Sequence, residues 1–211
     1  DSCLINKTKA SLLSELNNGD IVKINIADEI ITFFIAGHDT TALTLTYTCF
    51  LLANNPDKLK KVQAELKQMG LSLKVYDAYR PQQSVDHFVR WAKVMNDTLM
   101  KQLYYPDVQK SELFTLGFIA SKSGHTRGST VDLSIVDVKT NKEVDMGSSY
   151  DFFGEKSHPF YKKITEAQMK NRMLLRTIMI KNGFIPYDNE WWHFTLKDEP
   201  YPTTYFNFLI E

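Results

Sequence analysis

The sequence is poor in cysteine and carries no excess of either charge. Its 211 residues include two cysteines, Cys3 and Cys49, so a disulfide framework is excluded and any stapling must come from packing or a metal. Its 25 basic and 25 acidic side chains cancel, whereas nucleic-acid binders need a clustered positive excess. With 43% hydrophobic and 24% charged residues, the composition excludes a collagen-like or disordered chain. We therefore expect a globular protein that does not bind nucleic acid.

The distribution of apolar and charged residues also predicts neither a leader peptide nor a membrane span. The chain begins without a basic-then-apolar stretch, so we expect no signal peptide and a cytoplasmic location. Ionisable side chains interrupt the apolar stretch of residues 24–53 at Asp28, Glu29, His38 and Asp39. A membrane-spanning helix needs roughly 20 mostly apolar residues, so a long buried helix fits this stretch better. No feature of the sequence predicts an oligomeric state.

The charges are distributed unevenly along the chain. Residues 1–57 carry three lysines against seven acidic residues, so the rest of the chain has a basic excess. The acidic part is rich in threonine, and Asn54-Asn55-Pro56 is typical of a helix end because the residue before a proline avoids the helical region. Charge and texture together predict a helical segment over residues 1–57, followed by a second domain over 58–211.

The second part mixes helical and strand periodicity. Gly70 is expected to end a first helix, Ser84 to begin a second that continues to Leu103, and a capping box of Thr165 and Gln168 to begin a third. Strands are expected at residues 71–76, 117–120, 130–136, 193–196 and 205–210. Because the elements do not alternate strictly, we predict an α+β fold with a mostly antiparallel sheet flanked by helices.

Two short motifs place histidines beside carboxylates. His125 and Asp132 lie seven residues apart around a glycine turn, and Glu190 precedes His193 by three residues. Two histidines and one carboxylate can hold a catalytic zinc ion that keeps an open position for water. Glu190 would then be free to act as a general base. A turn histidine, a strand carboxylate and an aromatic loop edge would produce the same two motifs without a metal.

These motifs, together with Tyr-Asp-Ala-Tyr-Arg-Pro at residues 76–81, resemble the zinc D-alanyl-D-alanine dipeptidases of vancomycin resistance, the VanX type. The resemblance covers residues 59–211. It implies zinc ligands at His125, Asp132 and His193, a catalytic base at Glu190, a transition-state stabiliser at Arg80, and substrate contacts at Ser123 and Asp151. One position departs from the family, because Thr130 stands where an alanine is usual and is expected to crowd the site slightly.

The resemblance implies a hydrolase of cell-wall peptidoglycan chemistry that cleaves the small dipeptide D-alanyl-D-alanine with zinc as its cofactor. Two other hypotheses remain open. One is a D,D-carboxypeptidase that trims peptidoglycan stems, which would need an open groove. The other is an inactive zinc-binding module, because the N-terminal portion that closes the pocket in this family is replaced here.

The replacing segment has a resemblance of its own. Ala-Gly-His-Asp-Thr-Thr at residues 36–41 is similar to the long oxygen-activating helix of haem-thiolate monooxygenases, the cytochrome P-450 superfamily, over residues 24–66. In that family the thiolate ligand of the haem lies far downstream of this helix. Cys3 precedes the helix and Cys49 lies within it, so we expect no haem. A natural fusion, an engineered chimera and a misjoined sequence would all give this pattern.

Overall fold

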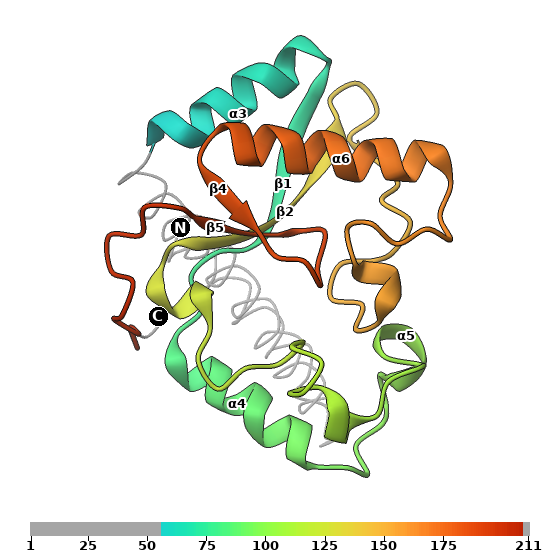
Figure 1. The fold of residues 1–211 in the computed structure, drawn as a ribbon, viewed down its shortest axis with the longest axis vertical. Coiled ribbons are helices and arrows are strands. Elements are labelled where there is room, and N and C mark those ends of the chain that lie inside the picture. The colour runs from blue at the N-terminus through green and yellow to red at the C-terminus, as the bar shows by residue number, and fades with distance from the viewer. Residues whose placement is uncertain (1–55, 209–211) are drawn as a thin grey trace, which may run out of the picture. The chain divides into compact units, whose positions relative to one another are not determined.

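The computed structural model describes residues 56–208, and the helix expected over 24–53 lies outside them. A five-stranded sheet with strand order β1-β2-β5-β4 forms its centre, with β3 paired to β2 (Figure 1). The strands are β1 (Leu71–Asp77), β2 (Thr130–Asp137), β3 (Lys142–Glu143), β4 (Phe184–Pro186) and β5 (His193–Leu196). All pairs are antiparallel, so the predicted α+β fold is confirmed for the described residues.

Two helices cover one side of the sheet. Helix α3 (Pro56–Gln68) packs on β1 and α6 (Glu166–Lys181) packs on β4, and the two helices also contact each other. Their apolar faces and the β2 residues Leu133 and Ile135 form the main core, in which Trp192 and Phe194 are fully buried. Because side chains alternate along a strand, Asp132 points to the other face of β2 from Leu133. The Asp132 side chain therefore lies outside the apolar core.

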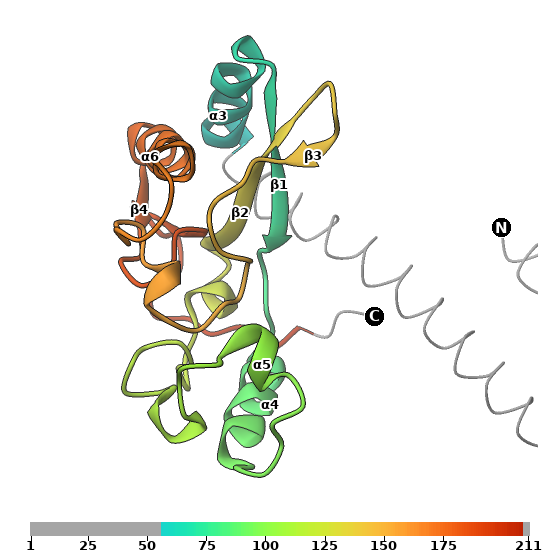
Figure 2. The ribbon, with the colours of Figure 1, turned by 90° about the vertical axis from the view of Figure 1, so that its right-hand side faces the viewer.

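A smaller layer lies at the opposite end of the domain (Figure 2). It contains α4 (Gln82–Lys93), α5 (Lys101–Tyr104) and the one-turn helix η1 (Lys110–Glu112), packed around a second core of Ala92, Tyr105, Val108, Leu113 and Ile119. Two further turns, η2 (Gly124–Arg127) and η3 (Glu155–Ser157), lead into β2 and towards α6. No helix within residues 56–208 is long and apolar enough to cross a membrane.

Several expected boundaries are confirmed, and those of the second helix are wrong. Gly70 ends α3 with a φ of +72°, and Thr165 and Gln168 form the expected capping box of α6. Helix α4 begins after Pro81 rather than at Ser84, because the proline ring fixes a suitable φ and the Pro81 carbonyl accepts the Ser84 N–H.

Helix α4 also ends at Lys93, well before the expected Leu103. The ammonium of Lys110 donates to the carbonyls of Trp91 and Val94 (3.1 and 2.9 Å) and satisfies the helix end. The apolar residues beyond it are largely exposed, with Leu99 at 87%. These residues therefore pack against no core, and their helical spacing does not extend the helix.

Two expected strands do not form. Residues 117–120 turn at Gly117, whose φ is +80°, and the N–H groups of Phe118 and Ile119 both bond to Leu113 in place of a neighbouring strand. Residues 205–208 are likewise not a strand. Phe206 donates to Thr126 in η2 and accepts from Gln82 in α4, which ties the chain across these elements.

Candidate active site

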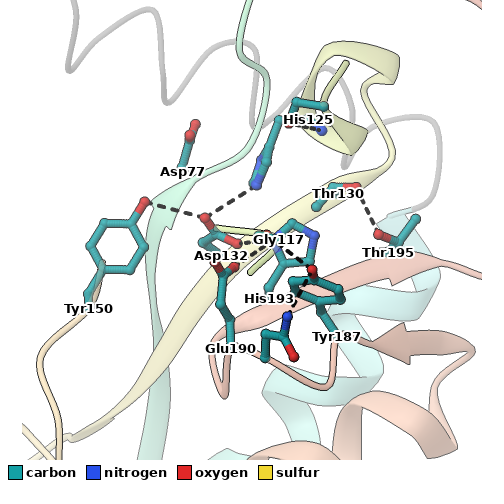
Figure 3. A network of polar contacts seen from close by, with 12 residues as sticks. Asp77, Gly117, His125, Thr130, Asp132, Tyr150, Tyr187, Glu190, His193 and Thr195 are labelled. Atoms are coloured by element: carbon teal, nitrogen blue, oxygen red, sulfur yellow. Dashed lines mark hydrogen bonds and ion pairs between the residues drawn. The ribbon is translucent and has the colours of Figure 1, made fainter. Parts of the chain in front are cut away.

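The three expected metal ligands come from one turn and two paired strands. His125 lies in η2, Asp132 in β2 and His193 at the start of β5, directly opposite Asp132 in the β2–β5 register. His125 Nε2 is 3.2 Å from Asp132 Oδ2, and His193 Nδ1 is 3.0 Å from Asp132 Oδ1 (Figure 3). Their potential ligand atoms all lie within 4.8 Å of one another. The group could therefore hold a single metal ion.

The turn around His125 fixes the orientation of its ring. The Ser123 hydroxyl oxygen accepts the N–H of His125, and Gly128 ends the turn with a φ of +73°. His125 Nδ1 lies 2.8 Å from the carbonyl oxygen of Ala78, so Nδ1 carries the hydrogen and Nε2 faces Asp132. A second hydrogen bond of this kind is the usual support of a metal-ligating histidine.

Asp132 provides a direct test of whether the group fits a cation. Its side chain is 3% exposed, and Oδ1 accepts no hydrogen bond of ordinary geometry within residues 56–208, although His193 Nδ1 is close. Burial alone would raise the pKa of Asp132, but the neighbouring imidazoles of His125 and His193 hold it below its usual range. A buried carboxylate that lies between two imidazole nitrogens and has one unsatisfied oxygen would be stabilised by a bound cation. The two nitrogens and one oxygen fit a divalent metal such as zinc.

Two further carboxyl groups lie beside this group. Glu190 Oε2 is 3.5 Å from His193 Nδ1. Burial and the charges of Asp132 and Asp151 raise the pKa of Glu190 well above its ordinary value. Burial and Asp132 also raise the pKa of Asp151 to about 7. Both carboxyl groups therefore hold protons more readily than a solvated carboxylate does.

Arg80 is fixed by an acidic residue that the sequence reasoning did not select. The Nε and Nη2 atoms of Arg80 both donate to Asp77 Oδ2, at 2.8 and 2.5 Å. Burial opposes the charge, but Asp77 and Asp132 raise the pKa of Arg80, so the guanidinium stays ionised. Asp77 lies three residues before Arg80 in the same motif, and this opposite-charge spacing was the signal that could have identified it.

All seven expected site residues line one cavity of about 280 Å³. They are Arg80, Ser123, His125, Asp132, Asp151, Glu190 and His193. The cavity lies between the sheet and α4, and Phe88, Phe118 and Phe153 supply apolar walls. Thr130, expected to crowd the site, is absent from these walls; its hydroxyl bonds to Thr195 at 2.9 Å.

A buried arginine on α6 ties down the segment that carries Asp151. Arg172 is 1% exposed and donates to the carbonyls of Met146, Lys156 and His158, at 2.5, 2.9 and 2.7 Å, and to the Ser148 hydroxyl at 3.3 Å. These acceptors lie at both ends of residues 146–158. No local pattern predicts this role, because the four acceptors lie 14 to 26 residues from Arg172 along the chain.

The Glu190 segment is attached to the same loop. The Trp191 backbone N–H donates to the Ser157 carbonyl, and its indole N–H donates to the Ser148 hydroxyl, both at 2.9 Å. One set of buried bonds therefore holds the segments of Asp151 and Glu190 together.

Comparisons with known proteins agree with this geometry. A family model described as D-ala-D-ala dipeptidase matches residues 39–211. The D-alanyl-D-alanine dipeptidase of Enterococcus faecalis is 47% identical over 152 residues, which are 72% of this chain and 75% of that protein. The D-alanyl-D-alanine dipeptidase of Enterococcus faecium is 38% identical over 177 residues, 84% of this chain and 85% of that protein.

The N-terminal part has different relatives. A family model described as cytochrome P-450 matches residues 1–72. A chloroplastic cytochrome P-450 of Pisum sativum is 47% identical over 64 residues, which are 29% of this chain and 12% of that protein. The similarity of the N-terminal segment to a monooxygenase fragment is thus confirmed.

Proposed function

Because this chain belongs to the D-ala-D-ala dipeptidase family of metallopeptidases, we propose that it hydrolyses the dipeptide D-alanyl-D-alanine with zinc as its cofactor. The observation that carries the proposal is the convergence of all seven expected site residues on one small cavity. Release of two D-alanine molecules would connect the enzyme to peptidoglycan chemistry and vancomycin resistance, as the resemblance implies. The cytoplasmic location stays a prediction.

We assign the zinc ion to His125, Asp132 and His193, whose ligand atoms are within 4.8 Å of one another. When bound, zinc supplies Lewis acidity, which polarises a carbonyl group and brings the pKa of water to about 7. Ala78 holds the His125 ring in the tautomer that leaves Nε2 free.

Glu190 is the proposed general base. It lies beside a metal ligand, 3.5 Å from His193 Nδ1, and lines the cavity in which the substrate would bind. It takes a proton from the attacking water and, because its protonated form is favoured in this buried place, keeps the proton until the amine leaves. The same carboxyl group then donates that proton to the nitrogen of the broken peptide bond.

Arg80 is the proposed stabiliser of the oxyanion. A guanidinium group has five N–H donors, and the contacts with Asp77 occupy one edge of it. The ion pair removes the rotational freedom of the side chain, so the remaining donors are already in place when negative charge develops on the carbonyl oxygen.

Ser123 and Asp151 are the proposed substrate contacts. The Ser123 hydroxyl accepts from the His125 N–H and retains its own hydrogen to donate to substrate. Asp151 lines the cavity and suits the free amino group of a dipeptide, which also restores the ionised form of this carboxyl group. A cavity of about 280 Å³ supports a dipeptide over a peptidoglycan stem, because a longer peptide needs an open groove.

The test is release of D-alanine from D-alanyl-D-alanine by the purified chain, with and without a chelator. Glu190→Gln should lower kcat by about 100-fold or more at unchanged zinc content, because only the proton transfer is lost. Glu65→Gln on α3 is the control, since Glu65 bonds Lys181 and does not line the cavity. Release that is insensitive to the chelator, or a stem peptide cleaved faster than the dipeptide, would contradict the proposal.

A further inference from the structure

Tyr150 lies to one side of the metal-binding group and directs its hydroxyl at one of the three ligands. The Tyr150 Oη atom donates to Asp132 Oδ2 at 3.3 Å (Figure 3). Tyr150 is not among the residues that line the site cavity. Neither the motifs nor the family resemblance drew attention to this residue.

Aromatic contacts hold the Tyr150 ring. It stacks on Tyr76 of β1, with ring centroids 4.2 Å apart and planes 10° from parallel, and meets Trp192 edge to face at 5.5 Å. Glu143 accepts the Tyr76 hydroxyl, which fixes the stacking partner in turn. Offset stacks and edge-to-face pairs of this kind define ring orientation as well as burying apolar area. The hydroxyl of Tyr150 is therefore presented to Asp132 by a rigid support.

The two oxygens of Asp132 have different surroundings as a result. Oδ2 accepts from Tyr150 and lies 3.2 Å from His125 Nε2. Oδ1 is the buried oxygen that accepts no ordinary hydrogen bond within the described residues. A carboxylate that is free on both sides can rotate about its terminal bond, whereas a donor on one oxygen selects one orientation. The contact thus leaves Oδ1 as the less satisfied oxygen.

We propose that Tyr150 is a positioning residue for the metal site, whose hydroxyl orients Asp132 and thereby raises metal affinity. The inference rests on the proposed function, since it takes Asp132 as a metal ligand. Partners that hydrogen-bond a ligating group typically contribute 10–100-fold in metal affinity. The 3.3 Å separation is long for an O–H donor, so the expected contribution is at the lower end, about 10-fold.

The experiment measures the zinc dissociation constant of the full chain by competition with a chromogenic chelator. The Tyr150→Phe variant keeps the aromatic stack and removes only the hydroxyl. Tyr76→Phe is the matched control, because it removes the other hydroxyl of the same stack, which bonds Glu143 and not Asp132. We expect the Kd for zinc to rise about 10-fold in Tyr150→Phe and to stay within twofold of wild type in Tyr76→Phe.

A second measurement separates positioning from a general structural effect. Urea denaturation of the metal-free variants checks that both remain folded with similar midpoints, so that a change in Kd is not a change in the folded fraction. If wild type binds zinc and Tyr150→Phe binds it equally well, the inference is overturned and the proposed function stands. Equal weakening in both variants also overturns it, because the stack would then be the cause. If the folded wild type binds no zinc, both proposals fail.

Discussion

Replacing Arg172 by methionine should lower the free energy of unfolding by about 3 kcal/mol, although Arg172 lies outside the cavity. Methionine fills much of the same volume without a donor, so the substitution removes mainly polar contacts. Three backbone carbonyls lose their charged donor, that of Met146 in a buried bond and those of Lys156 and His158 in partly buried ones, while the Ser148 hydroxyl keeps the Trp191 indole as a partner.

The magnitude follows from two opposing contributions. Each unsatisfied buried acceptor costs about 1–3 kcal/mol, so one buried and two partly buried acceptors cost about 5 kcal/mol together. Burial of the guanidinium lowers the pKa of Arg172 to about 10, so removing this charge from water costs free energy in the folded state. Removing the charge returns about 2 kcal/mol of that cost. The protein should stay folded, because typical domains have 5–15 kcal/mol in reserve.

The assay is urea denaturation of metal-free protein followed by tryptophan fluorescence, with the free energy taken by linear extrapolation. Arg176→Met is the control on the same helix, because Arg176 contacts the exposed carboxylate of Asp188 at 3.2 Å and such pairs contribute about 1 kcal/mol or less. A loss below about 1 kcal/mol for Arg172→Met, or equal losses for both variants, would refute the role assigned to its hydrogen bonds.

Two further predictions concern the carboxyl groups of the site. Asp77→Asn should lower kcat by about 10-fold with little change in KM, because the Arg80 guanidinium loses its ionic support but not its charge; steady-state kinetics measure this, and an unchanged kcat would contradict it. Burial and Asp132 raise the pKa of Asp151 from 3.8 to about 7, so the folded state binds this proton more tightly than the unfolded state. The metal-free protein should therefore lose stability as the pH rises from about 4 to 7, by up to about 4 kcal/mol from this group. Asp151→Asn should flatten that slope in denaturation experiments across this range, and equal slopes would show that the carboxyl group does not titrate in this way.

Short sequence motifs correctly predicted the ends of those helices that depend only on residues within one turn. The capping box of Thr165 and Gln168 needs only its own turn, and the glycine that ends α3 needs only a positive φ. The end of α4 could not be predicted in this way, because the donor that caps it belongs to Lys110, far along the chain. The apolar residues 117–120 were mistaken for a strand because periodicity does not reveal which backbone partner is available.

The same distinction applies to the site. The motifs, together with the family resemblance that they carry, supplied every residue that lines the cavity with a proposed role. The residues that orient them were missed. Tyr150 and Arg172 act through contacts with residues distant in sequence, and their identities alone indicate only an aromatic and a basic side chain. Asp77 was also missed, although it lies only three residues before Arg80 and its opposite charge could have indicated the pair.

The pairing of Asp132 with His193 across β2 and β5 has a consequence for how the protein matures. Because side chains alternate along a strand, a slip of one residue would turn His193 towards the apolar core and bring Phe194 to its place. These strands are far apart in sequence, so their pairing carries a high cost in loop-closure entropy. A chain that pairs them wrongly has no complete set of ligands. Binding of the proposed metal ion would therefore stabilise only molecules in which the two strands are correctly paired.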